Sequence, residues 1–417
     1  MCCLKKSKHI LFLFLIVSFQ TTYAQKNEVY ESLEDALKNP EQVYKLDLSE
    51  SELVELPESI GLFTHLTWLN LSDNKLRDLP NAMQNLTELT DLYLENNLFL
   101  VVPEVIFGFS KLNYLDFSKN YLKSIPNHIS NLYNIQNLDL RHNQIEEVPL
   151  GITTLGSLKY LDLTKNKIRE IPSDFNKLIR LTHLFLTDNQ LTEFPKSVQV
   201  MSNLKYFGIS GNDIKIIPEF VGDFKNLVSL NLSQTNIKSL PKSFENLTTL
   251  KYLYLYGNKF ETVPSEVFKI HGLTTLNMNM NKISFLPNNF EQLSNLEFLF
   301  FNNNLLYDLP KSLKALTHLK LLYLKGNKFS KVPKVISRLY GLDYLNLSDN
   351  NIKRIPRFIK KLSKLNGLNL RSNQLIKLPR TFKKLTNLGR LNVKQNQIKQ
   401  KHISRIEKQL PNCEVSK

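Results

Sequence analysis

The sequence predicts a right-handed, curved α/β solenoid, with a parallel β-sheet on its concave side and short helical or extended segments on its convex side. Two observations lead to this fold class. Fifteen of the 17 prolines lie 23 residues apart, from Pro57 to Pro379. One apolar pattern, LxxLxLxxNxLxxLPxxIxxLxx, begins at Val43 and recurs without insertion or deletion to its last copy at Leu388. A fixed period of this length is typical of solenoids, in which each unit packs only on its two neighbours.

Each unit is expected to begin with a short strand and to leave it by a fixed turn. In residues 66–80, LTWLNLSDNKLRDLP, leucines flank Asn70 on both sides, which is the alternation of a strand with one buried face. Asn74 follows, and its side chain can bond backbone groups that the turn exposes. Fourteen of sixteen units have Asn there, with Ser51 and Thr235 as the exceptions. The Leu-Pro pair then fixes φ and ends the local hydrogen bonding.

The chain is expected to have four regions. Residues 1–24 are typical of a secretory signal peptide, because three lysines precede a ten-residue apolar run and a small-residue cleavage site. Residues 25–42 are predicted to form an N-terminal helical cap, and residues 43–387 fifteen 23-residue repeats. Residues 388–417 would hold the last repeat and a C-terminal cap. The mature chain is therefore expected to be exported without a transmembrane span, and to be secreted, periplasmic or held at the cell surface, although an uncleaved anchor is the alternative.

Cysteine usage supports export from a bacterial cell. Removal of the signal peptide leaves only Cys413, so no internal disulfide can form. Cys2 and Cys3 precede the apolar run, whereas a lipid-anchored Cys would follow the cleavage point. Cys413 is interpreted as a cap residue or an exposed thiol rather than a nucleophile.

The 23-residue unit resembles the leucine-rich repeat family, and the match covers nearly the whole mature chain. The resemblance implies a horseshoe-shaped solenoid. The Leu-Pro-x-x-Ile form is similar to that of bacterial secreted repeat proteins, Ras-pathway scaffold proteins and plant disease-resistance proteins. In that family such arrays bind proteins, sometimes in signalling, and the family supplies no catalytic residues.

The sequence contains no pattern that indicates catalysis, so no catalytic residue, metal or cofactor is predicted and the protein is not expected to be an enzyme. It has no phosphate-binding glycine loop, no nucleophile elbow and no paired-histidine zinc motif. Asp116, Asp139 and Asp162 occupy the same concave position in consecutive repeats. Because Lys119, Arg141 and Lys165 lie two or three residues after them, a neutralised polar face is the first interpretation. A contact for a cationic patch on a partner is the second, and a calcium site the last, because three side chains rarely complete its coordination.

The predicted concave face is rich in aromatic side chains. Two positions of each strand point there, and twelve of these 32 positions are aromatic in a chain whose overall aromatic content is 10%. Strand propensity and ring stacking explain part of this excess. The clustering favours a docking surface instead, because Tyr and Trp are enriched in binding hot spots. The candidate partner-binding residues, with Tyr256 added just beyond its strand, are Trp68, Tyr93, Tyr114, Tyr160, Phe185, Tyr206, Tyr252, Tyr254, Tyr256, Phe298, Phe300, Tyr323 and Tyr344.

Charge is divided unevenly along the chain. Residues 311–417 contain 26 Lys and Arg against 4 Asp and Glu, whereas residues 25–310 contain 25 against 34. A solvated face is one interpretation of the basic end, and attachment to an anionic envelope, host glycosaminoglycan or nucleic acid is the other. Nucleic acid is disfavoured because the charge lies away from the aromatic residues. The possible anion-binding residues are Lys353, Arg354, Arg357, Lys360, Lys361 and Lys364.

These observations together predict an exported, non-enzymatic interaction module that binds a protein on its aromatic concave face, at a host or cell surface or in signalling. A carbohydrate-binding or polyanion-binding adhesin, acting through the concave rings or the basic end, is the alternative. A structural envelope protein is a third, weaker possibility. Pairing of two molecules through their concave faces stays open.

Overall fold

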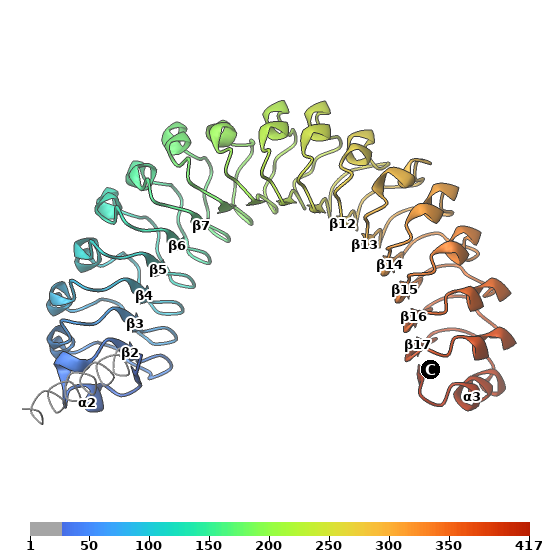
Figure 1. Ribbon diagram of the computed structural model, residues 1–417, viewed down its shortest axis with the longest axis horizontal. Helices are drawn as coiled ribbons and strands as arrows, with labels where there is room; N and C mark the ends of the chain where they lie inside the picture. Colours follow the sequence, from blue (N-terminus) through green and yellow to red (C-terminus); the bar gives the residue numbers. More distant parts are fainter. Residues whose placement is uncertain (1–26) are drawn as a thin grey trace, which may run out of the picture. The chain divides into compact units, whose positions relative to one another are not determined.

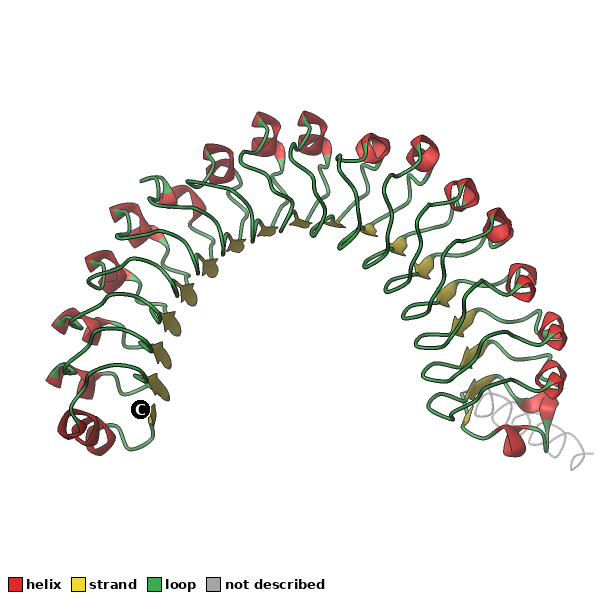
Figure 2. Cartoon of the chain, turned by 180° about the vertical axis from the view of Figure 1, so that it is seen from behind, coloured by secondary structure: helices red, strands yellow, loops and turns green. Residues whose placement is uncertain are grey.

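The computed structural model describes residues 27–417, and the predicted signal peptide lies outside them. The chain divides into two compact units. The first contains the residues up to Gln190 together with Pro195–Met201, and the second contains Leu191–Phe194 together with Ser202–Lys417. In both units the strands line the inner side and short helical turns the outer side (Figures 1 and 2).

The first unit contains eight parallel strands that pair in chain order. They are β1 (Val29–Tyr30), β2 (Lys45–Asp47), β3 (Trp68–Asn70), β4 (Asp91–Tyr93), β5 (Tyr114–Asp116), β6 (Asn137–Asp139), β7 (Tyr160–Asp162) and β8 (His183–Phe185). Between β1 and β2 lie the helix α2 (Leu33–Ala36) and a 3-10 turn (Pro40–Gln42). The Ser32 hydroxyl caps α2 by accepting a hydrogen bond from the Asp35 backbone N–H at 3.3 Å.

The second unit contains ten parallel strands, again paired in chain order. They are β9 (Tyr206–Gly208), β10 (Ser229–Asn231), β11 (Tyr252–Tyr254), β12 (Thr275–Asn277), β13 (Phe298–Phe300), β14 (Leu321–Tyr323), β15 (Tyr344–Asn346), β16 (Gly367–Asn369), β17 (Arg390–Asn392) and β18 (Glu414–Ser416). The helix α3 (Gln400–Gln409) precedes β18 and buries Ile403 and Ile406. No helix among residues 27–417 is long and apolar enough to cross a membrane.

Each repeat strand is three residues long and pairs in register with the residues one repeat away. In β3 and β4, for example, Leu69 lies opposite Leu92, and Asn70 opposite Tyr93. The central residue of every repeat strand is buried, so these residues form the inner wall of the core. The two flanking residues point to the concave side, as the two-residue period of a strand requires. The predicted fold class, a parallel-strand solenoid, is confirmed.

The outer segments are 3-10 turns of four or five residues rather than longer helices. They are Glu58–Leu62, Asn81–Asn85, Glu104–Gly108, Asn127–Asn131, Leu150–Thr154, Ser173–Lys177, Lys196–Val200, Glu219–Asp223, Lys242–Asn246, Ser265–Lys269, Phe290–Leu293, Lys311–Ala315, Lys334–Arg338, Arg357–Lys361 and Arg380–Lys384. All but one follow the repeat proline directly. The apolar residue three positions after that proline, such as Ile60 or Met83, is buried and closes the core from the outside.

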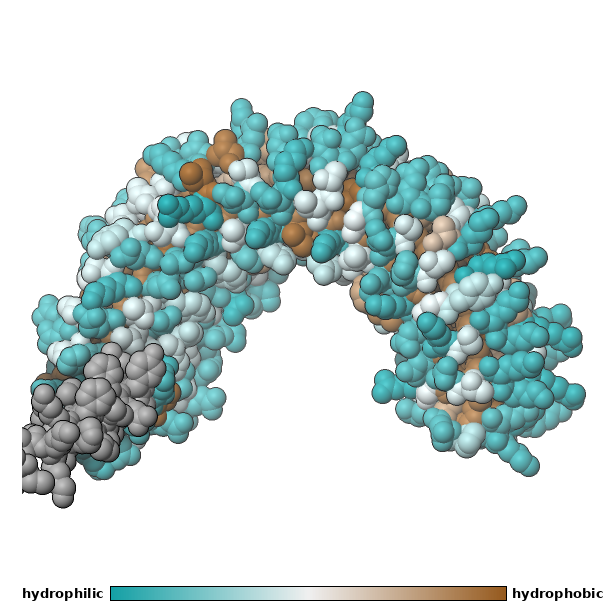
Figure 3. All heavy atoms as spheres, viewed as in Figure 1, coloured by the Kyte–Doolittle hydropathy of each residue, from teal (hydrophilic) through white to brown (hydrophobic). Residues whose placement is uncertain are grey.

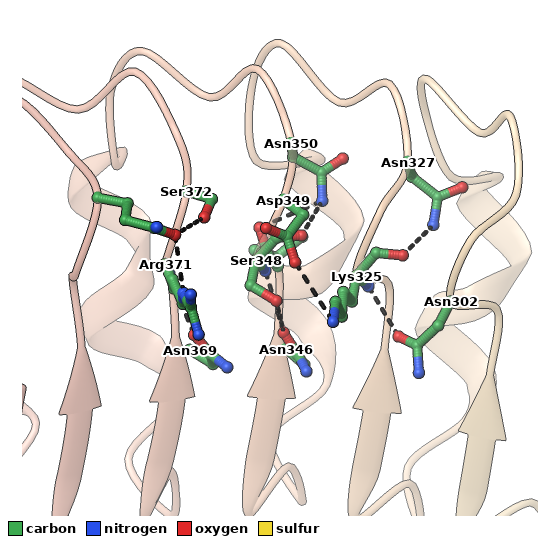
Figure 4. Close-up of polar contacts among 12 residues, drawn as sticks. Asn302, Lys325, Asn327, Asn346, Ser348, Asp349, Asn350, Asn369, Arg371 and Ser372 are labelled. Carbon is green, nitrogen blue, oxygen red and sulfur yellow. Dashed lines mark hydrogen bonds and ion pairs between the residues drawn. The ribbon is translucent and has the colours of Figure 1, made fainter.

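A ladder of asparagines holds successive repeats together. The Asn350 amide nitrogen donates to the carbonyl oxygens of Leu347 (3.2 Å) and Ser348 (2.9 Å) in its own repeat (Figure 4). It also donates to the carbonyl of Leu324 in the preceding repeat at 3.0 Å. Its side-chain oxygen accepts the backbone N–H of Phe329 at 3.0 Å. One buried side chain therefore satisfies several backbone groups that the turn leaves without strand partners.

Glycine is required where two outer turns pack tightly. A Cβ at Gly222 would lie 2.3 Å from the carbonyl oxygen of Ser243 and 2.5 Å from its Cβ, so the turns would have to separate. We expect Gly222→Ala to lower the free energy of unfolding by about 2 kcal/mol, because a buried clash is relieved only by backbone movement. Urea denaturation followed by circular dichroism measures the change.

Gly108 provides the matched control. It lies in an equivalent outer turn, and a Cβ there meets nothing within 4 Å. Gly108→Ala is expected to be neutral or to stabilise by up to about 1 kcal/mol, because alanine has less backbone freedom to lose. Equal losses in the two variants would show that packing between the turns is not the cause.

Candidate binding surface

The thirteen aromatic residues predicted to bind a partner are all half-buried. Twelve of them are flanking residues of strands β3 to β15, so they stand on the concave side. Tyr256 lies two residues after β11 ends, in the turn that leaves the strand. Each ring is therefore partly covered by the protein and keeps part of its surface open to solvent.

The first unit has two groups of stacked rings. Trp68, Tyr93 and Tyr114 form one across β3, β4 and β5, with ring centroids 5.4 Å and 4.7 Å apart in that order. Tyr160 and Phe185 form the other, 5.8 Å apart. His183 packs against both of them at 5.7 Å and 6.4 Å. The sequence prediction did not include His183, although its strand position was a sufficient signal.

The second unit has one continuous stack and a separate tyrosine pair. Phe300, Tyr323 and Tyr344 follow one another across β13 to β15 with centroid distances of 5.1 Å and 5.2 Å. Beyond them the Tyr344 ring lies over Gly367, where a Cβ would be only 2.3 Å from the ring. Tyr252 and Tyr254 stand on β11, and the polar strand β12 separates them from β13.

Three carboxylates form a buried row between the two ring groups of the first unit. Asp116, Asp139 and Asp162 are neighbours in the register of β5, β6 and β7 and are 4–6% exposed. Each accepts a hydrogen bond from the backbone N–H two residues later, at 2.8, 3.1 and 2.8 Å respectively. We call this row, defined by the three aspartates, the acidic ladder.

A single cation pairs with the acidic ladder among the described residues. Arg141 places its Nε 3.3 Å from Oδ2 of Asp139. Lys119, which the sequence suggested as a second neutralising residue, instead pairs with Glu95 at 2.8 Å. The neutralised-face interpretation is therefore only partly right, because three buried carboxylates share one close guanidinium.

Burial shifts the titration of Asp116 and Asp139, and a neighbouring carboxylate adds to the shift at Asp139. Desolvation, with the Asp116 charge as the next cause, raises the pKa of Asp139 to about 7. Desolvation also raises the pKa of Asp116, although the hydrogen bonds from Ser118 act to lower it. The pKa of Tyr160 is raised by burial and by Asp162, whose Oδ2 accepts its hydroxyl at 3.3 Å. No group of three or more His, Cys, Asp or Glu in residues 27–417 has an arrangement that could hold a metal ion.

The six predicted anion-binding residues are exposed on the outer side of the second unit. They are Lys353, Arg354, Arg357, Lys360, Lys361 and Lys364, and three of them belong to the turn Arg357–Lys361. None of the six forms an ion pair with a described residue. Cys413 is buried beside the C-terminal strand, and burial raises the pKa of its thiol.

Family models match most of the chain. The model described as "Leucine rich repeat" matches residues 41–99, 96–145, 156–214, 202–260 and 341–398. The model described as "Leucine-rich repeat region" matches residues 242–328. A search of the curated proteins finds no match.

Solved structures agree with these family matches. The leucine-rich repeat protein LIC12759 of Leptospira interrogans is 34% identical, with 94% of this chain and 100% of that chain covered and a TM-score of 0.88. The plant peptide hormone receptor RGFR1, in complex with RGF2, is 29% identical over 89% of this chain and 62% of its own, with a TM-score of 0.69. An internalin, inlF, of Listeria monocytogenes is 25% identical over 73% and 87%, with a TM-score of 0.66.

Proposed function

Because this chain belongs to the leucine-rich repeat family, we propose that it is an exported, non-enzymatic module that binds a protein or peptide on its concave strands. The observation that carries this proposal is the half-buried rings of both units. Several of them, Trp68, Tyr93 and Tyr114 in the first unit and Phe300, Tyr323 and Tyr344 in the second, are ordered by stacking on rings of neighbouring strands. All of them keep part of their surface open to solvent. Such rings have little side-chain entropy left to lose, so they bind with a small ordering cost.

The relatives support the same kind of partner. RGFR1 is a peptide hormone receptor solved with its ligand, and it shares 29% of its aligned residues with this chain. The concave strands of this chain offer partly open rings, flanked in the second unit by half-buried amide side chains such as Asn277 and Asn369. An extended peptide suits such a surface because it can contact many shallow rings in turn without needing a deep pocket. Export rests on the predicted signal peptide.

Four concave rings of the second unit provide the test. A variant with Tyr252→Ser, Tyr254→Ser, Phe300→Ser and Tyr323→Ser is expected to lose binding by at least about 100-fold, because truncated hot-spot aromatics cost about 1–4 kcal/mol each. The mature chain, immobilised, would capture partners from host and bacterial surface extracts, and the affinity of each captured partner would then be measured with purified material.

The control variant removes four exposed tyrosines from outside the concave strands. Tyr121, Tyr133, Tyr307 and Tyr340 are 46–63% exposed, and their change to Ser should leave binding within about twofold. Circular dichroism must first show that both variants keep the fold. A partner that survives protease but is lost after periodate oxidation would favour the carbohydrate alternative. Equal binding by the two variants would exclude the concave rings as the site.

A further inference from the structure

A cavity with an apolar floor on the outer side of the second unit is ringed by cations. Its volume is ≈ 800 Å³, and three consecutive repeats contribute to it. Leu309, Val332 and Ile355, each from the Leu-Pro segment or its equivalent, form an apolar floor and are 4–8% exposed. The cavity also has five basic residues and one acidic residue, Asp308. We call this the basic cavity, and its five cations are Lys311, Lys331, Lys334, Arg354 and Arg357.

The cations of the basic cavity lack internal counter-charges. All five are exposed, and none forms an ion pair with a described residue. The Asp308 carboxylate accepts the backbone N–H of Leu309 at 2.9 Å, so one of its oxygens is engaged by its own turn. Hydrophilic side chains crowd the outer edge of this part of the chain (Figure 3). The five cations of the basic cavity repel one another, which destabilises the protein without a ligand. This repulsion favours the binding of an anionic ligand.

A second cavity of the same unit shows that the fold does not require this charge. It lies at the equivalent place between earlier repeats, has a volume of ≈ 500 Å³ and also follows the Leu-Pro segments. Two lysines, Lys238 and Lys259, are balanced there by Glu261 and Glu266. The cavity is thus a general product of repeat stacking, whereas its excess of cations is specific to the later repeats.

The cations are also arranged periodically. Lys311, Lys334 and Arg357 each follow the repeat proline, one repeat apart. Lys331 and Arg354 each stand two residues before that proline, in neighbouring repeats. Two regular columns of positive charge therefore flank an apolar floor, which suits a linear ligand with evenly spaced anionic groups and flat apolar faces between them.

We propose that the basic cavity binds an acidic polysaccharide, with sugar rings on the apolar floor and sulfate or carboxylate groups on the two cation columns. A bare phosphate would not use the floor. This site is separate from the concave strands, so the inference does not depend on the proposed function. The protein would then hold an anionic glycan on its outer side while its concave side remains free.

Titration of the mature chain with a fluorescently labelled sulfated polysaccharide such as heparin tests this proposal. At about 0.15 M salt, Lys331→Gln with Arg354→Gln and Arg357→Gln is expected to weaken binding at least about tenfold, because each cation that contacts a polyanion releases counterions. The control changes Lys238, Lys242 and Lys259 to Gln, which removes the same number of charges at and beside the second cavity; Lys242 directly follows its repeat proline, as Arg357 does. It should weaken binding less than about twofold.

Competition identifies the ligand class. Unlabelled sulfated or uronate polysaccharide is expected to displace the probe, whereas neutral dextran is not. Displacement by single-stranded DNA or by vesicles of anionic lipid at equal charge concentration would overturn the polysaccharide assignment. Equal losses in the two triple variants, or no binding by the parent chain, would overturn the cavity itself.

Discussion

Asn350→Ala is expected to lower the free energy of unfolding by about 3 kcal/mol. The side chain is 7% exposed, so water cannot replace its bonds. Alanine would leave the carbonyls of Leu324 and Leu347 and the N–H of Phe329 without their present partner. Each buried unsatisfied group costs about 1–3 kcal/mol, and relaxation of the turn recovers only part of that cost.

The natural exception in the ladder suggests an intermediate variant. Thr235 keeps one of the usual contacts, because its hydroxyl donates to the carbonyl of Leu232 at 2.7 Å. Asn350→Thr is therefore expected to lose less stability than Asn350→Ala. The neighbouring Asn351 is exposed, and Asn351→Ala should change stability by less than about 0.5 kcal/mol.

Urea denaturation gives these free energies, and amide hydrogen exchange locates the loss. Exchange of the Phe329 N–H should accelerate in the Asn350→Ala variant. Losses of similar size in the Asn350→Ala and Asn351→Ala variants would contradict the assigned role of the ladder.

Raising the pH from about 4 to about 7 is expected to destabilise the first unit through Asp139. The pKa of its carboxyl is about 7 in the folded protein, above the ordinary value of 3.8. The folded state therefore favours the protonated form of Asp139. The stability that this preference contributes is fully present below about pH 4 and is lost as the pH rises to about 7. The difference between these two pKa values corresponds to a loss of stability of about 4 kcal/mol.

Asp139→Asn should remove this dependence. The amide has nearly the same shape, stays neutral, and can still accept the Arg141 backbone N–H that now bonds the carboxylate at 3.1 Å. The variant is expected to match the parent chain near pH 4 and to be more stable by about 2–3 kcal/mol near pH 8. Thermal denaturation at a series of pH values measures the difference.

An exposed carboxylate serves as the control. Asp223→Asn lies on an outer turn and should give a difference from the parent that is small at every pH. If Asp139→Asn were less stable than the parent chain at pH 8, the ion pair with Arg141 would outweigh the desolvation of the carboxyl, and the titration described here would be wrong.

The sequence predicts the repeat architecture well because one spacing governs it. Each repeat has a leucine-flanked strand, a turn with an asparagine and a proline at fixed intervals. Because no insertion interrupts this spacing, the repeats can stack on one another in only one register. The strand β18 (Glu414–Ser416) could not be predicted in this way, because it pairs with β17 but lacks the repeat pattern. The uniform period also does not predict the division into two compact units.

The candidate surface was predictable only as a set of positions. Strand alternation predicts that Tyr160 and Asp162 lie on one side of β7. It does not predict the hydrogen bond from the Tyr160 hydroxyl to the Asp162 carboxylate. Sequence spacing also gives Lys119 and Arg141 similar access to the acidic ladder, whereas only Arg141 reaches it. Long side chains choose among several rotamers, and their choice depends on neighbours from other repeats. The basic cavity likewise arises from residues that meet only after stacking.

The asparagine ladder has a consequence for how such a gene can change. Each amide reaches carbonyls 3 and 26 residues earlier and an N–H 21 residues earlier, as Asn350 shows. Gain or loss of one whole 23-residue period preserves every one of these bonds, whereas any other insertion within a turn breaks them. Recombination between repeats can therefore lengthen or shorten the array in whole steps, and each step adds or removes one row of concave side chains. Rearrangement of existing repeats can in this way change the concave surface, while the hydrogen bonds that hold the repeats together stay the same.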